Sequence, residues 1–198
     1  MPYNLAIYFD QSKQQLWEKS LFTPEHLVIA TDGAVKNNAP KDYELSGIMT
    51  YSDGALTSSL ISVGGIGNSS YNAETEAILK ALTVIETSYQ KNMHSVTDCL
   101  SFLTKATQWR KWDTSIESKI AEKITRITKN KTLSFHHVTS HNAIGINCAV
   151  DELITVAWHK IKNSLGNVPM VPKTHQEVKE AIKSKLTKDH TNRLERRT

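Results

Sequence analysis

The stretch LVIATDG, residues 27–33, is a continuous apolar run that ends in an aspartate and a glycine. Such a run is typical of a short strand that is buried on both faces of a sheet. Residues 45–52 and 55–63 are also strand-like, and only Asp53-Gly54 separates them. Because this dipeptide is the strongest short-range hairpin signal, we expect a central strand followed by an antiparallel pair.

The rest of the sequence alternates between helical and strand-like patterns. Apolar residues at helical spacing predict a long helix after the hairpin and another close to residue 150. Short apolar segments between the helices predict two more strands. The expected helices span residues 73–87, 99–109, 114–128 and 144–162, and the expected strands span residues 94–98 and 132–138. The predicted element order is therefore βββαβααβα.

The composition is that of an ordinary globular chain with a basic end. Its 198 residues are 39% hydrophobic and 22% charged, which allows one core domain and an appendage. Residues 159–198 carry 10 Lys and Arg against 4 Asp and Glu, whereas the residues before them carry 14 against 16. We expect a leader at residues 1–25, a domain at 26–163 and a basic, helix-like extension at 164–198.

The sequence favours an intracellular protein that does not enter membranes. No apolar run approaches the roughly 18 residues of a membrane helix, and the N-terminus lacks the pattern of a signal peptide. The two cysteines, Cys99 and Cys148, form no CxxC pair, which favours free thiols in a reducing compartment. These features fit the nucleus and the cytoplasm equally well.

Four acidic residues lie where solvation alone explains them poorly. Asp32 and Asp98 each end a predicted strand, and reactive groups gather at the carboxyl ends of strands in α/β sheets. Glu74 begins the apolar stripe of its helix, and Asp151 follows Asn147 by one helical turn. Each has an ordinary alternative as a cap, turn or hydrogen-bonding residue. Converging carboxylates repel one another unless cations neutralise them, so together they predict a site for Mg²⁺ or Mn²⁺.

The segments around these acids, IATDGA, NAETEAIL, SVTDCLS and SHNAIGINCAVDEL, resemble the four motifs of the ribonuclease H family. The resemblance covers residues 27–162 and is closest to type 1-like domains of non-LTR retrotransposon polyproteins. It implies an α/β ribonuclease H-like fold with a mixed five-stranded sheet, three antiparallel strands followed by parallel ones, flanked by helices. It also implies an endonuclease that hydrolyses the RNA strand of an RNA–DNA hybrid.

The resemblance also implies roles for five residues. Two Mg²⁺ or Mn²⁺ ions about 4 Å apart would bind on either side of the scissile phosphate. Asp32 would bridge both ions, and Glu74 and Asp98 would hold the ion nearer the leaving group. Asp151 would help to hold the ion on the nucleophile side. His141 would assist proton transfer or product departure rather than bind metal.

Weaker signals concern contacts with the nucleic acid. Amide groups near the motifs are candidates for the minor groove, although turn formation or local hydrogen bonding explains them as well. A run of tryptophans and basic residues could lie on a phosphate backbone, and its ordinary alternative is a helix end whose indoles pack inward. The candidates are Gly33, Asn72, Asn147, Trp109, Arg110 and Lys111.

The basic extension suggests an origin. The segment VPMVPKTHQEVKEAIKSKL, residues 168–186, resembles the one that follows ribonuclease H in those polyproteins. We therefore expect a retroelement-derived domain, with a reverse transcriptase region upstream in the parent polyprotein. The first alternative is a catalytically silent module of the same fold that binds nucleic acid or acts as a scaffold. The second is a transposase or Holliday-junction nuclease on that fold. The four carboxylates argue against the first, and the histidine loop argues against the second.

Overall fold

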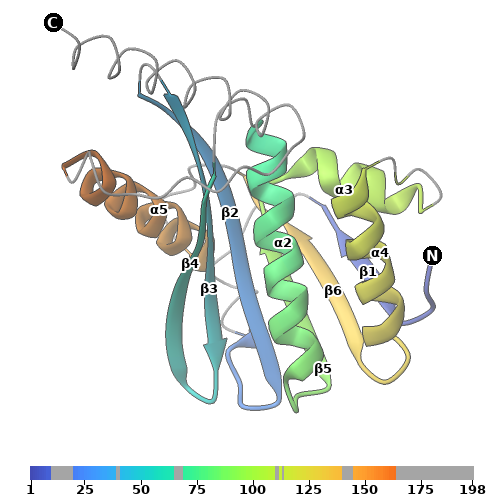
Figure 1. The fold of residues 1–198 in the computed structure, drawn as a ribbon. Coiled ribbons are helices and arrows are strands. Elements are labelled where there is room, and N and C mark those ends of the chain that lie inside the picture. Colours follow the sequence, from blue (N-terminus) through green and yellow to red (C-terminus); the bar gives the residue numbers. More distant parts are fainter. Residues whose placement is uncertain are drawn as a thin grey trace, which may run out of the picture.

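The computed structural model describes residues 1–9, 20–38, 41–64, 69–109, 112, 114–139 and 145–163. These residues form one six-stranded sheet with helices on both faces, in the strand order β1-β6-β5-β2-β3-β4 (Figure 1). The strands are β1 Leu5–Tyr8, β2 His26–Asn38, β3 Lys41–Ser52, β4 Ala55–Gly64, β5 Asn92–Thr97 and β6 Thr132–His137. The helices are α2 Ser70–Thr87, α3 Leu100–Thr107, α4 Ser115–Ile127 and α5 Ile146–Asn163.

The expected fold class and element order are confirmed, with one added strand. β1 comes from the segment that we expected as a leader, and it pairs in parallel with β6 from Leu5↔Leu133 to Tyr8↔His136. Asn4 also donates a hydrogen bond to the carbonyl of Thr128 at 2.9 Å. The sheet therefore has six strands rather than five, because a four-residue strand is too short to show a period in the sequence.

The predicted hairpin is confirmed at its turn. Asp53 has φ of 52° and Gly54 has φ of 77°, the two positive values that a two-residue type I′ turn requires. β3 and β4 pair on either side of it, starting at Ser52↔Ala55. The predicted end of the central strand at residue 33 is wrong, because β2 continues to Asn38. Antiparallel pairing with β3 supports this continuation as far as Asn38↔Lys41.

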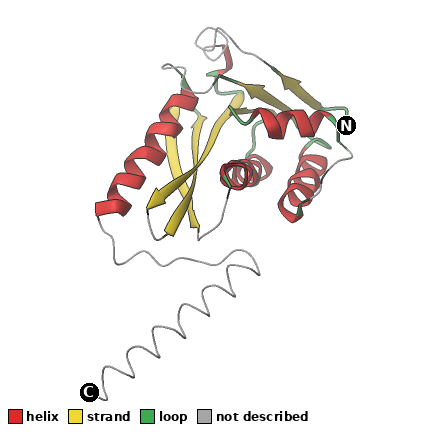
Figure 2. Ribbon diagram, turned by 90° about the horizontal axis from the view of Figure 1, so that it is seen from above, coloured by secondary structure: helices red, strands yellow, loops and turns green. Residues whose placement is uncertain are grey.

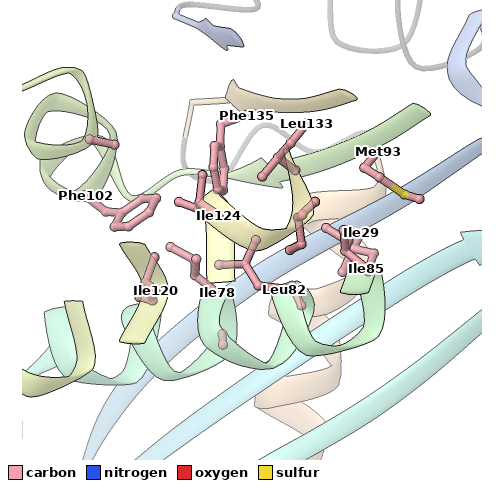
Figure 3. Packing of buried hydrophobic residues seen from close by; sticks show 14 of the residues in the cluster. Ile29, Ile78, Leu82, Ile85, Met93, Phe102, Ile120, Ile124, Leu133 and Phe135 are labelled. Carbon is pink, nitrogen blue, oxygen red and sulfur yellow. The ribbon is translucent and has the colours of Figure 1, made fainter. Parts of the chain in front are cut away.

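Helices α2, α3 and α4 cover one face of the sheet and α5 covers the other (Figure 2). The larger core lies under the first three helices, where Ile78, Leu82 and Ile85 of α2 meet strand and helix residues (Figure 3). Phe102 of α3 packs edge-on against Phe135 of β6, with ring centroids 5.5 Å apart. Each such buried side chain stabilises the fold by roughly 1.5–3 kcal/mol.

The basic extension at 164–198 lies beyond the described residues. Among the helices that the structure does describe, none is long and apolar enough to cross a membrane.

Candidate metal centre

The register of the central strands brings Asp32 and Asp98 together. β2 and β5 run in parallel until Thr31↔Thr97, which is their last pair. β5 ends there, while β2 continues beside β3. Asp32 and Asp98 are the next residues along the chain after this pair, so both lie where the sheet opens between β2 and β5. This is the carboxyl end of a parallel pair, where α/β sheets place their reactive groups.

The first turn of α2 approaches the same point because Gly33 has no side chain. A Cβ atom at Gly33 would lie 2.3 Å from the carbonyl carbon of Ala73 and 2.3 Å from the nitrogen of Glu74. Ser46 of β3 fixes the approach, since its hydroxyl donates a 2.8 Å hydrogen bond to the carbonyl oxygen of Ala73. Close backbone packing therefore requires glycine at position 33, and this packing places Glu74 next to Asp32.

Three carboxylates meet at this point. Asp32, Glu74 and Asp98 each offer an oxygen, and these oxygens all lie within 4.8 Å of one another. Gly33 donates its backbone N–H to Oδ1 of Asp32 at 2.8 Å. In contrast, Oε2 of Glu74 and Oδ1 of Asp98 are buried without a hydrogen-bond partner among the described residues. Buried oxygens with unused acceptor capacity, together with hard oxygen donors, fit Mg²⁺ or Mn²⁺.

The pKa values of the cluster show the same shortage of positive charge. Burial raises the pKa of Asp32 to about 6, with further contributions from the charges of Asp98 and Asp151. Burial raises the pKa of Glu74 to about 10, and the charges of Asp32 and Asp98 add to this shift. A bound cation would favour the ionised form of these groups and reverse both shifts.

Asp151 lies near this cluster without joining it. It belongs to α5, on the other face of the sheet, and its charge is among the causes that raise the pKa of Asp32. Its carboxylate is not one of the three whose oxygens lie within 4.8 Å of one another. Asn147 lies one turn earlier and is only 6% exposed, with a buried Oδ1 that has no hydrogen-bond partner among the described residues.

The other predicted site residues are placed differently. Trp109 packs against Trp112 with ring centroids 5.6 Å apart, and Trp112 packs against Phe102 at 6.1 Å. This is the inward packing that we named as the ordinary alternative for the tryptophan run. Asn72 lies in the first turn of α2, where its backbone N–H donates to the hydroxyl of the N-cap Ser69. His141, Arg110 and Lys111 lie outside the described residues.

The sequence reasoning missed two residues near the site, Ser46 and Glu117. The hydroxyl of Ser46 is buried in a strand and had no motif to mark it. Glu117 did have a signal, because Thr114 and Glu117 form the T-x-x-E pattern of a capping box. Thr114 caps α4, and its hydroxyl accepts a hydrogen bond from the backbone N–H of Glu117.

Comparisons with known proteins agree with this geometry. The sequence model of the RNase H family matches residues 24–159, which include every strand and helix from β2 through most of α5. Among solved structures, the fold is similar to LC9-RNase H1, described as a type 1 RNase H with the type 2 active-site motif. The TM-score is 0.51 at 14% sequence identity, over 70% of this chain and 74% of that one. No curated protein sequence matches the chain. With the family model covering more than half of its length, the chain belongs to the RNase H family.

Proposed function

We propose that the protein is an endonuclease that hydrolyses the RNA strand of RNA–DNA hybrids with two Mg²⁺ or Mn²⁺ ions. Family membership supports hybrid nuclease activity in general. The observation that carries the proposal is the meeting of Asp32, Glu74 and Asp98 within 4.8 Å at the carboxyl end of β5. A module that only bound nucleic acid would gain nothing from buried acids facing phosphates, because like charges repel.

The chain supplies the ligands for such a site. Asp32, Glu74 and Asp98 would hold the metal ions through their carboxylate oxygens, and Asp151 would approach from α5. Ions held there would provide the means to activate a water molecule and to stabilise the leaving oxygen. Gly33 N–H keeps the carboxylate of Asp32 oriented while the ions bind. We assign proton transfer or product departure to His141, on the basis of the resemblance in its loop.

We further propose a retroelement origin, with a reverse transcriptase region upstream in the parent polyprotein. The support is the resemblance of residues 168–186 to the segment that follows ribonuclease H in such polyproteins. The basic character of this region also suits a surface that contacts phosphates.

The test uses three labelled duplexes, an RNA–DNA hybrid, duplex DNA and duplex RNA, each with Mg²⁺ and with Mn²⁺. The matched variant is Asp32→Asn, which keeps the size of the side chain and removes its charge. We expect cleavage of the hybrid alone, into products with a 5′ phosphate and a 3′ hydroxyl, and loss of cleavage in the variant. Binding of the hybrid without cleavage under both metals would establish the silent module instead. Cleavage of duplex DNA would favour a DNA nuclease of the same fold.

A further inference from the structure

Another acidic residue, Glu117, is fully buried where three helices meet. Its exposed fraction is 0%, and it is the third residue of α4. Lys105 donates to both of its oxygens, at 2.8 and 3.0 Å. Tyr71 donates its hydroxyl to Oε1 at 2.6 Å, and the backbone N–H of Thr114 donates to Oε2 at 2.9 Å. One carboxylate therefore joins the first turn of α2, α3 and the first turn of α4.

A buried carboxylate of this kind fixes geometry more than it adds stability. Removing a charge from water is costly, and the cost is offset only when its partners stay in place. The interior also strengthens each of these charge-assisted hydrogen bonds. Any movement of Tyr71 or Lys105 away from Glu117 would leave a desolvated charge, so the three side chains hold their helices in one arrangement.

One of the elements joined in this way carries Glu74, and another begins just after Asp98. Tyr71 lies three residues before Glu74, on the same turn of α2, and its carbonyl accepts a 2.9 Å hydrogen bond from the hydroxyl of Thr75. Lys105 belongs to α3, which begins two residues after Asp98. The three helices lie together on one face of the sheet (Figure 1).

The first turn of α2 is thereby held from two sides. On the sheet side, Gly33 allows contact with Ala73, and Ser46 bonds to its carbonyl. On the helix side, Tyr71 bonds to Glu117. Glu74 follows this turn directly, so its backbone is held in a fixed position relative to Asp32.

We propose that Tyr71, Glu117 and Lys105 are positioning residues that set the metal affinity of the centre by fixing the carboxylates of Glu74 and Asp98. The inference deepens the proposed function and rests on it for the choice of cation. Groups that orient metal ligands typically change metal affinity by 10- to 100-fold when they are removed. We expect the effect on metal binding rather than on hybrid binding, because the three residues hold the helix that carries a metal ligand.

The experiment measures Mn²⁺ binding to the metal-free full chain by calorimetry, without nucleic acid. Tyr71→Phe is the first variant, since it keeps the ring in the core and removes only the hydroxyl that bonds to Glu117. We expect the Kd for Mn²⁺ to rise about 10-fold in Tyr71→Phe and at least as much in Glu117→Gln. Should Glu117→Gln fail to fold, Tyr71→Phe decides alone.

The matched control is Glu86→Gln, at the other end of the same helix pair. Glu86 of α2 bonds to Lys123 and Arg126 of α4, each at 2.7 Å. This variant breaks an α2–α4 bridge far along the helix from Glu74, so we expect a lower Tm with an unchanged Kd for Mn²⁺. An unchanged Kd in folded Tyr71→Phe overturns the inference, and so does an equal rise in Glu86→Gln.

Cleavage assays separate this inference from the proposed function. In Tyr71→Phe, the Mn²⁺ concentration for half-maximal hybrid cleavage should rise with the Kd, while kcat at saturating Mn²⁺ and KM for the hybrid stay near those of the unaltered protein. A reduced kcat at saturating metal with an unchanged Kd counts against positioning. A protein that binds Mn²⁺ but never cleaves the hybrid refutes the proposed function, and the comparison of Kd values still decides the inference.

Discussion

The two ends of α2 treat their carboxylates in opposite ways. Glu86, in the last turn, bonds to Arg126 and Lys123, and these hydrogen bonds lower its pKa to about 2. Glu74, near the start of the helix, faces Asp32 and Asp98, and burial together with their charges raises its pKa to about 10. Within the described part of the chain, no ion pair joins the three clustered acids to a lysine or an arginine.

This difference shows that the chain pairs a carboxylate with its own cations where that carboxylate stabilises the fold. Even the buried Glu117 receives a lysine, a tyrosine hydroxyl and a backbone N–H. Among the described residues, the cluster of Asp32, Glu74 and Asp98 receives the N–H of Gly33 but no lysine or arginine, so its negative charge is left for a bound cation to neutralise. That is the expected arrangement for a centre that binds cations, because a permanent internal cation would compete with the metal.

The largest effect is expected for Glu74→Gln. Hybrid cleavage should fall by about 1000-fold or more, since the metal supplies several kcal/mol of stabilisation to the transition state. The metal-free variant should be more stable than the unaltered protein at pH 7 by on the order of 1 kcal/mol, because the folded state no longer forces protonation of a buried carboxyl. Cleavage rates and urea unfolding in EDTA measure the two effects. If the variant loses both activity and stability, Glu74 stabilises the fold in the way that Glu86 and Glu117 do.

The next effect is expected for Glu117→Ala, which removes the acid that serves the fold. Lys105, Tyr71 and the N–H of Thr114 would lose their shared acceptor, and α4 would lose its capping box. Lys105 is 25% exposed and can reach water, so the free energy of unfolding should fall by about 2–3 kcal/mol rather than the full cost of breaking a fully buried pair. Chemical unfolding measures this loss. A loss of unfolding free energy of only about 0.5–1 kcal/mol would show that Glu117 resembles the partly exposed Glu86.

The sequence predicted the fold well where a local signal existed. The dipeptide Asp53-Gly54 predicted the hairpin, and apolar spacing predicted α2 and α5. The continuation of β2 to Asn38 had no such signal, because this part of the strand pairs on one side only and its residues are mixed in character. β1 also had no local signal, because its four residues form a strand through their pairing with β6.

The candidate site divides in the same way. Strand ends and helical spacing singled out Asp32, Glu74 and Asp98, and the structure brings these three together. The bond from Tyr71 to Glu117 joins residues 46 positions apart, and no local pattern encodes a contact of that range. The capping-box pattern marks Glu117 as part of a helix start. It does not show that the carboxylate also accepts hydrogen bonds from residues of α2 and α3.

The third effect is the response of the metal-free protein to pH. The pKa of Asp32 is raised from 3.8 to about 6 in the folded state, so its contribution to stability is full below pH 3.8 and is lost as the pH rises through 6. We expect the free energy of unfolding to fall across this window by on the order of 2 kcal/mol. Urea unfolding in EDTA measures the slope. Asp32→Asn should remove the slope below pH 4.5 and reduce it between pH 4.5 and 6, where Glu74, whose pKa is raised from 4.5 to about 10, also contributes. Saturating Mg²⁺ should abolish the slope by favouring the ionised carboxylates. A slope that is unchanged in Asp32→Asn would assign it to other groups.

The smallest effect is expected for Glu86→Gln, and its pH dependence has the opposite sign. The pKa of Glu86 is lowered from 4.5 to about 2, so its contribution is present above pH 4.5 and is lost as the pH falls toward 2. Because the pair is partly open to solvent, the loss at pH 7 should be about 0.5–1 kcal/mol, and it should shrink further in high salt. Near pH 2 the variant and the unaltered protein should unfold alike. Urea unfolding at both pH values, with and without added salt, measures this. A salt-independent loss of unfolding free energy as large as that of Glu117→Ala would mean that both ends of the α2–α4 contact stabilise the fold equally. The contrast between the two ends of α2 would then rest on Glu74 alone.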